Sequence, residues 1–162
     1  MIISSTEFKN NDFLKKEHEF NQFDGNGDNR SPEIFWADAP AGTQSFAITV
    51  YDPDAPTGSG FWHWVAFDIP VETQSLPANA GQSDGSQLPI GTIQSRNDYG
   101  LSGFGGCCPP VGDKAHRYIF TVHALSVEIL PGVDAETTNA VARFMIQANT
   151  LATASITGYY QR

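Results

Sequence analysis

Two aspartates stand on either side of a proline in the segment Asp52-Pro53-Asp54-Ala55-Pro56, which follows an apolar strand pattern at 45–51. Each proline pushes the residue before it into an extended conformation. Side chains two residues apart in an extended segment point the same way, so Asp52 and Asp54 are predicted to converge on one point. The alternative is a proline-rich turn in which both aspartates cap backbone N–H groups.

One histidine, His63, stands between two tryptophans in Trp62-His63-Trp64, so its ring is expected to be at least partly buried. A buried imidazole needs a hydrogen-bond partner for each ring nitrogen, and Asp52 or Asp54 could supply one. The alternative is a structural histidine whose nitrogens find their partners elsewhere.

His116 and Tyr118 are two residues apart at the start of a predicted strand, so their side chains should share a face. The preceding loop, Gly105-Gly106-Cys107-Cys108-Pro109-Pro110, contains glycines that let a ligand approach the backbone and its N–H donors. An imidazole, a phenol and N–H groups together would form a cradle for a small anion. The alternative is a tight loop that only leads into the strand. The adjacent Cys107 and Cys108 are expected to be small loop thiols rather than a disulfide framework or a zinc site.

The other two histidines are expected to take no part in the site. His18 lies in a run of charged residues typical of a surface, and His123 alternates with core positions on a predicted strand. Motifs for a nucleophile elbow, a phosphate-binding P-loop and a calcium-binding EF-hand are absent or incomplete. Phe104, for example, stands where the elbow requires its second glycine.

The elements that position these residues are mostly strands. Alternating or branched apolar residues predict strands at 45–51, 61–69 and 117–125, with weaker candidates at 34–36 and 90–93. Glycine- and proline-rich turn signals separate them, which favours an antiparallel β-sandwich. In the first strand, the residues expected on one face are Phe46, Ile48 and Val50.

One amphipathic helix is predicted late in the sequence, with Asp134 as its N-cap. A single helix cannot cover both faces of a sheet, so it should pack over one face or one end. Its apolar residues recur at steps of three and four, namely Val141, Phe144, Met145, Ala148 and Leu151.

The composition fits one globular domain spanning residues 1–162. Lys and Arg number 9 against 18 Asp and Glu, which gives a formal charge of −9 and disfavours nucleic acid as a partner. No apolar run approaches the roughly 20 residues of a membrane helix. The first residues lack the cationic and apolar regions of a signal peptide, so a cytoplasmic location is expected.

Taken together and in this order, the motifs resemble the phosphatidylethanolamine-binding protein family, also called the Raf kinase inhibitor protein family, and most closely its bacterial branch. The resemblance covers about residues 20–125. The matching stretches are Gly27-Asp28-Asn29-Arg30-Ser31-Pro32 with Trp36, Asp52 to Gly58, His63-Trp64-Val65, Asn97-Asp98-Tyr99-Gly100, Gly105 to Pro110, and His116-Arg117-Tyr118. One departure is Cys107, which stands where the bacterial loop usually has a proline.

The resemblance implies a mostly β fold, a Greek-key antiparallel β-sandwich with a C-terminal helical segment. It also implies a small pocket for phosphate, phosphoethanolamine or similar anions, and a binding protein rather than an enzyme, with no metal or cofactor. Bacterial relatives suggest a homodimer, and some eukaryotic relatives regulate kinases or inhibit proteases. Carried over by position, the pocket residues are Asp52, Asp54, His63, Pro110, His116 and Tyr118.

The hypothesis for this pocket is that Asp52 and Asp54 accept hydrogen bonds from both histidines and from backbone N–H groups. The anion then meets imidazolium, the Tyr118 hydroxyl and the loop donors, while a carboxylate could meet the ammonium of ethanolamine. We expect ligands of headgroup size rather than whole lipids. The alternatives are a hydrolase, with or without a metal, that uses the Asp/His cluster, and a protein-interaction module whose surfaces lie outside the pocket.

Overall fold

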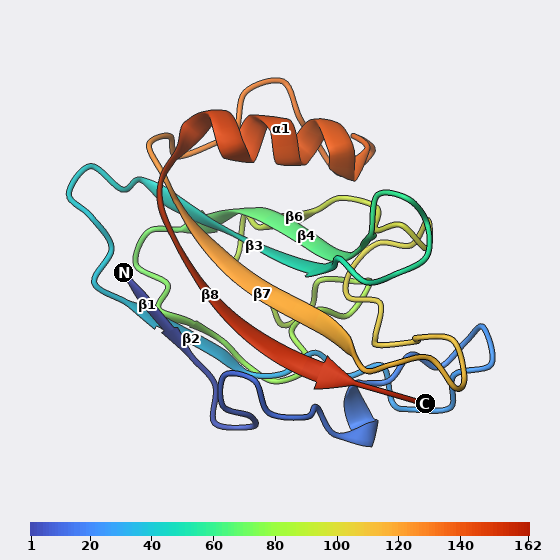
Figure 1. Ribbon diagram of the computed structural model, residues 1–162. Helices are drawn as coiled ribbons and strands as arrows, with labels where there is room; N and C mark the ends of the chain where they lie inside the picture. Colours follow the sequence, from blue (N-terminus) through green and yellow to red (C-terminus); the bar gives the residue numbers. More distant parts are fainter.

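The computed structural model describes residues 1–162 and contains two antiparallel β-sheets (Figure 1). The larger sheet has five strands in the order β6-β4-β3-β7-β8, and the smaller has three in the order β1-β2-β5. The strands of the larger sheet are β3 (Ser45–Asp52), β4 (Phe61–Pro70), β6 (Ile93–Gln94), β7 (His116–Leu125) and β8 (Thr150–Tyr160). Those of the smaller sheet are β1 (Ile2–Ser4), β2 (Ile34–Ala37) and β5 (Ser75–Leu76), and a short 3-10 helix, η1 (Lys16–His18), follows β1.

The main core lies between the two sheets. Phe46, Ile48 and Val50 of β3 point into it, as their alternation in the sequence predicted. Ile34 and Trp36 of β2 are buried in the same core. Burying a side chain of this size stabilises the fold by about 1.5–3 kcal/mol. Strand β7 pairs with β3 rather than with the strand before it, which is a Greek-key crossover, so the predicted sandwich is confirmed.

The three strands predicted most clearly are confirmed to within one residue at either end, and the weaker candidate at 34–36 is β2. The strand predicted at 90–93 is wrong for most of its length. Only Ile93 belongs to β6, while Ile90 is 98% exposed on a turn. Most of this short apolar run, which lies beside Pro and Gly, therefore belongs to a turn and is not part of the core.

Helix α1 (Asn139–Asn149) covers the face of the larger sheet that is turned away from the smaller sheet (Figure 1). Ala142 and Ile146, one helical turn apart, pack against Ala47 of β3 and Val65 of β4 in a second, smaller core. The molecule is thus built in three layers, and the expectation of a helix over one face is confirmed. This helix falls short of the length and hydrophobicity needed to span a bilayer.

The predicted helix start at Asp134 is wrong. Asp134 Oδ1 accepts hydrogen bonds from the backbone N–H groups of Glu136 and Thr137, which forms a turn before the helix. The N-cap position is Thr138 instead. Asp134 caps backbone groups as its residue type favours, but these groups belong to a turn.

The predicted apolar face of the helix is also wrong in part. Val141 and Phe144 are 50% and 72% exposed, while Ala142 and Ile146 are buried. The helix carries apolar residues on two faces, and packing against the sheet selects only one of them. Periodicity alone could not choose between these faces.

Strand β8 begins directly after α1 and was not predicted, although Leu151 was assigned to the helix. It pairs with β7 along its length, and Tyr160 lies opposite His116. Its small polar residues give no apolar alternation, so only its content of Thr, Ile and Tyr indicated a strand. This pairing brings the C-terminal end of the chain beside the start of β7.

His123 lies between α1 and the larger sheet, where its Nε2 is 3.1 Å from Thr49 Oγ1 and its buried Nδ1 has no partner. Burial lowers the pKa of His123 to about 4, and burial also lowers the pKa values of His18 and His63. In the unfolded chain these groups return to a pKa of about 6.5. Below that pH the unfolded state therefore binds more protons than the folded state.

The free energy of unfolding is therefore expected to fall as the pH decreases from about 6.5 towards 4. Urea denaturation at a series of pH values checks this. The variant His123→Leu should have a shallower pH dependence, because it removes the group whose pKa is shifted to about 4. An identical pH dependence in this variant would contradict the assignment.

Candidate functional site

A cavity of about 150 Å³ opens at the edge of the larger sheet where β3 ends and β4 and β7 begin. Asp52 is the last residue of β3, His63 the third of β4, and His116 and Tyr118 the first and third of β7. These strands are antiparallel neighbours, so their ends meet at one place. The residues that line the cavity are Asp52, Ala55, Pro56, Thr57, Phe61, His63, Tyr99, Cys108, Pro109, Pro110, His116 and Tyr118.

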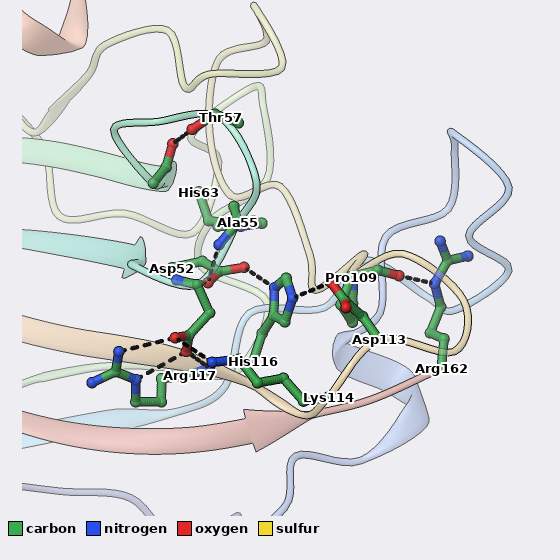
Figure 2. Close-up of polar contacts among 12 residues, drawn as sticks. Asp52, Ala55, Thr57, His63, Pro109, Asp113, Lys114, His116, Arg117 and Arg162 are labelled. Carbon is green, nitrogen blue, oxygen red and sulfur yellow. Dashed lines mark hydrogen bonds and ion pairs between the residues drawn. The ribbon is translucent and has the colours of Figure 1, made fainter.

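His116 is held between two carboxylates, as Figure 2 shows. Its Nδ1 lies 2.8 Å from Asp52 Oδ2, and its Nε2 lies 3.1 Å from Asp113 Oδ2. The side chains of His116 and Asp52 are only 1% and 3% exposed, whereas that of Asp113 is 45% exposed. Both contacts are hydrogen bonds at once only when each ring nitrogen carries a proton.

Asp52 also fixes the turn that follows β3. Its Oδ1 accepts hydrogen bonds from the backbone N–H groups of Asp54 at 2.8 Å and Ala55 at 3.1 Å. This carboxylate therefore positions the His116 imidazole and shapes one wall of the cavity. The predicted pairing of Asp52 with a histidine is present, and the partner is His116.

His63 has a different environment from the one predicted. Its Nδ1 donates to the Gly105 carbonyl at 2.7 Å, and no aspartate contacts the ring. Burial lowers the pKa of His63, so the neutral ring is the ordinary form at neutral pH. In that form the donor role of Nδ1 leaves Nε2 as an acceptor. The ring is enclosed by Tyr99 and Tyr118, both in edge contact.

The hydroxyl of Tyr118 is buried and has no hydrogen-bond partner within the protein. Burial raises its pKa, so the hydroxyl remains a donor. Leaving such a group unpaired costs about 1–3 kcal/mol, which a bound acceptor at the cavity would recover. Tyr118, His63 and His116 all line this one small space.

Asp54 does not line the cavity, contrary to the prediction that it would converge with Asp52. Its carboxylate accepts hydrogen bonds from Arg117 Nε and Nη2, both at 2.9 Å, and from the Arg117 backbone N–H at 3.0 Å. The Arg117 guanidinium holds the pKa of Asp54 well below its usual range. The segment is a turn capped by Asp52 rather than an extended stretch, so the rule for residues two apart does not apply.

The glycines of the loop 105–110 do not present N–H donors to the cavity. The Gly105 N–H donates to the His63 carbonyl at 2.8 Å, and the Gly106 N–H donates to Asn29 Oδ1 at 2.6 Å. They allow close packing instead, since a Cβ at Gly106 would lie 2.4 Å from the His18 carbonyl oxygen. The lining residues of this loop are Cys108, Pro109 and Pro110.

The variant Gly106→Ala is expected to displace this loop, because the added methyl group meets backbone atoms that cannot turn aside. We expect a destabilisation of about 1–3 kcal/mol and weaker ligand binding. Thermal unfolding and ligand titration check both effects. Gly112→Ala is the control, since its Cβ would meet no atom within 4 Å, although its φ of 83° adds some backbone strain. Equal effects of the two changes would contradict the packing role.

Among the site residues that were not assigned a role from the sequence, three contact His63 or His116. Tyr99 stacks on Phe20 with ring centroids 4.1 Å apart and forms one wall of the cavity. Phe61 lies against both His63 and Tyr99. Asp113 contacts His116 from three residues earlier in the chain. For Asp113, the only available signal was its short spacing from His116, which does not by itself indicate a contact in a loop.

The two cysteines near the cavity are poorly suited to nucleophilic chemistry. Burial raises the pKa of Cys108 and raises that of Cys107 well above its ordinary value, which favours the thiol over the reactive thiolate. The Cys108 Sγ lies 3.4 Å from the Phe23 carbonyl oxygen and is turned towards the loop.

The model of the family described as phosphatidylethanolamine-binding protein matches residues 4–161. The UPF0098 protein YbcL of Escherichia coli is 50% identical over 159 residues, which is 98% of this chain and 86% of YbcL. YbhB of the same organism is 46% identical over 160 residues, 99% of each chain. The crystal structure of E. coli YbcL, described as a new member of the mammalian PEBP family, matches with a TM-score of 0.96 at 49% identity, over 99% of this chain and 98% of the other. The chain therefore belongs to the phosphatidylethanolamine-binding protein family.

Proposed function

We propose that this protein binds small phosphate-type anions, such as phosphate or the phosphoethanolamine headgroup, in the cavity at the start of β7. The observation that carries the proposal is the buried Tyr118 hydroxyl, a donor without a partner that lies beside His63 and His116. A phosphate oxygen can accept from Tyr118, and a protonated His63 can donate from Nε2 to another. Asp52 serves to orient His116 rather than to contact the ligand.

The size of the cavity supports a ligand of headgroup scale. Its volume of about 150 Å³ is small beside the 300 Å³ or more that is usual for sites of drug-sized ligands. Acyl chains would have to remain outside. The exposed carboxylate of Asp113 stands next to His116 and is the group best placed to meet the ammonium of an ethanolamine.

We propose a binding role and not catalysis. The hydrolase alternative needs an activated nucleophile, and the raised pKa values of Cys107 and Cys108 argue against a cysteine in that role. Three further proposals follow from family membership and from the sequence. They are that the protein regulates a kinase or protease, that it forms a homodimer, and that it is located in the cytoplasm.

The proposal is tested by following the four histidines by proton NMR while phosphoethanolamine is added stepwise. We expect saturable shifts of the His63 and His116 signals, assigned with single substitutions, and no comparable shift at His123. Ethanolamine without phosphate serves as the control ligand. Saturable binding without a response at His63 and His116 would place the ligand elsewhere and contradict the proposal.

A further inference from the structure

A group of side chains of types that can bind a metal ion lies outside the anion cavity, where η1 meets the N-terminal segment. His18, expected to be exposed, is fully buried at 0% exposure. Its Nδ1 donates to the Arg30 carbonyl at 2.7 Å. This bond fixes the tautomer, so the Nε2 of the neutral ring carries a free lone pair.

The Nε2 of His18 is buried and has no hydrogen-bond partner. It faces Glu17 Oε1 at 3.8 Å. Two acceptors thus face each other in a poorly solvated place, and an unpaired acceptor of this kind is costly unless a positive group lies between them.

Glu7 supplies a second carboxylate at the same point. One ligand atom each from Glu7, Glu17 and His18 lies within 4.8 Å of the other two. Glu7 is held by the backbone N–H of Glu33, which donates to its Oε2 at 2.6 Å. Its other oxygen pairs with the guanidinium of Arg30.

Arg30 is the cation that now neutralises the two glutamates. Its Nη1 pairs with Glu7 and lies 3.4 Å from Glu17 Oε1, but it makes no bond to His18 Nε2. The Arg30 side chain is 29% exposed, so it can turn out into water. Its departure would leave one imidazole nitrogen and two carboxylates around an open position.

We propose that Glu7, Glu17 and His18 form a binding site for a divalent transition-metal cation of the zinc type, which displaces the Arg30 side chain. Imidazole and carboxylate donors suit zinc better than magnesium or calcium. Bonds of about 2.0–2.2 Å at tetrahedral angles place ligand atoms roughly 3.3–3.6 Å apart, so the group must contract modestly. Glu17, at 32% side-chain exposure, has room to move.

The ion would also connect two parts of the chain. The His18 carbonyl accepts a hydrogen bond from Cys107 N–H at 3.0 Å, which ties η1 to the loop beside the anion cavity. Binding at Glu7, Glu17 and His18 would therefore stabilise the folded protein. The site does not depend on the proposed anion function, since it shares no residue with the lining of that cavity.

The test is calorimetric titration of the full chain with zinc chloride at pH 7.5, together with 15N NMR of the histidine rings. We expect one equivalent of zinc to bind and the His18 Nε2 signal to shift, and magnesium to have no such effect. Glu17→Gln should weaken zinc binding at least tenfold without the folding risk of replacing a buried histidine. Glu33→Gln, a nearby glutamate outside the three ligands, is the matched control and should leave the affinity within about twofold.

Arg30→Met gives an independent readout. It removes the competing cation but keeps the backbone carbonyl that orients His18, so zinc should bind at least tenfold more tightly and raise the melting temperature. Absence of zinc binding in both the wild type and Arg30→Met would overturn the proposal. Binding that is unchanged in Glu17→Gln, or that leaves the His18 ring unshifted, would overturn it equally.

Discussion

Replacing His116 by alanine is expected to lower the free energy of unfolding by about 3–5 kcal/mol and to abolish phosphoethanolamine binding. The imidazole pairs with Asp52 at 2.8 Å, and both side chains are almost fully buried. Removing one partner leaves an uncompensated carboxylate in the protein interior, which is far more costly than losing an exposed ion pair. The same change removes a polar side chain from the wall of the cavity.

Urea denaturation measures the loss of stability, and calorimetry with phosphoethanolamine measures the loss of binding. Arg117→Ala, one residue along β7, is the control because its ion pair with Asp54 has the arginine 46% exposed. We expect this control to cost about 1 kcal/mol and to retain binding. Adding Asp52→Asn to His116→Ala should restore part of the lost stability, since it removes the buried charge. If the double variant loses as much stability as the two single variants together, the buried ion pair is contradicted.

Anion affinity is expected to decrease at least tenfold between pH 5.5 and pH 8. Burial lowers the pKa of His63 in the free protein, so the ring is neutral at neutral pH. A bound anion favours the imidazolium form and raises the pKa of the complex. Binding is therefore accompanied by proton uptake, and the affinity falls by up to about tenfold per pH unit between the pKa values of the free and bound protein.

Sulfate is the appropriate probe, because its charge does not change over this pH range and the protein alone supplies the dependence. Calorimetry in two buffers with different ionisation enthalpies measures the proton uptake directly. His63→Gln should bind more weakly at pH 5.5 and lose most of the pH dependence. A sulfate affinity that stays constant from pH 5.5 to pH 8 in the wild type would contradict coupling between anion binding and the protonation of His63.

The fold could be predicted where packing against the core requires a periodic pattern of apolar residues in the sequence. Phe46, Ile48 and Val50 alternate because one face of β3 is in the main core. Strand β8 has no such pattern, because its first half carries small polar residues at a sheet edge. The helix face was misjudged because the exposed Phe144 completes an apolar stripe in the sequence, while Ala142 and Ile146 reach the sheet.

Within the site, chain position predicted which backbone ends meet but not where each side chain points. Asp52, His63, Pro110, His116 and Tyr118 all line one cavity. Asp54 turns away because Arg117 offers two donors and a backbone N–H on the other side.

The burial of His18 could not be predicted from its charged neighbours in the sequence. Its neighbours Glu17 and Glu19 are charged, yet Glu19 is itself buried, with Lys16 and the Tyr160 hydroxyl as partners. A run of charged residues indicates a surface only when these charges lack partners within the fold.

The most direct test of the central claim is calorimetric titration of phosphoethanolamine into the wild type and Tyr118→Phe. The hydroxyl has no partner in the protein, so its removal should leave the free energy of unfolding unchanged or slightly higher. A hydrogen bond to a charged ligand contributes about 1.5–3 kcal/mol, so the affinity should fall by roughly tenfold or more. Weaker binding with undiminished stability is the predicted result. Equal affinity of the two proteins would contradict a site in which Tyr118 holds the anion.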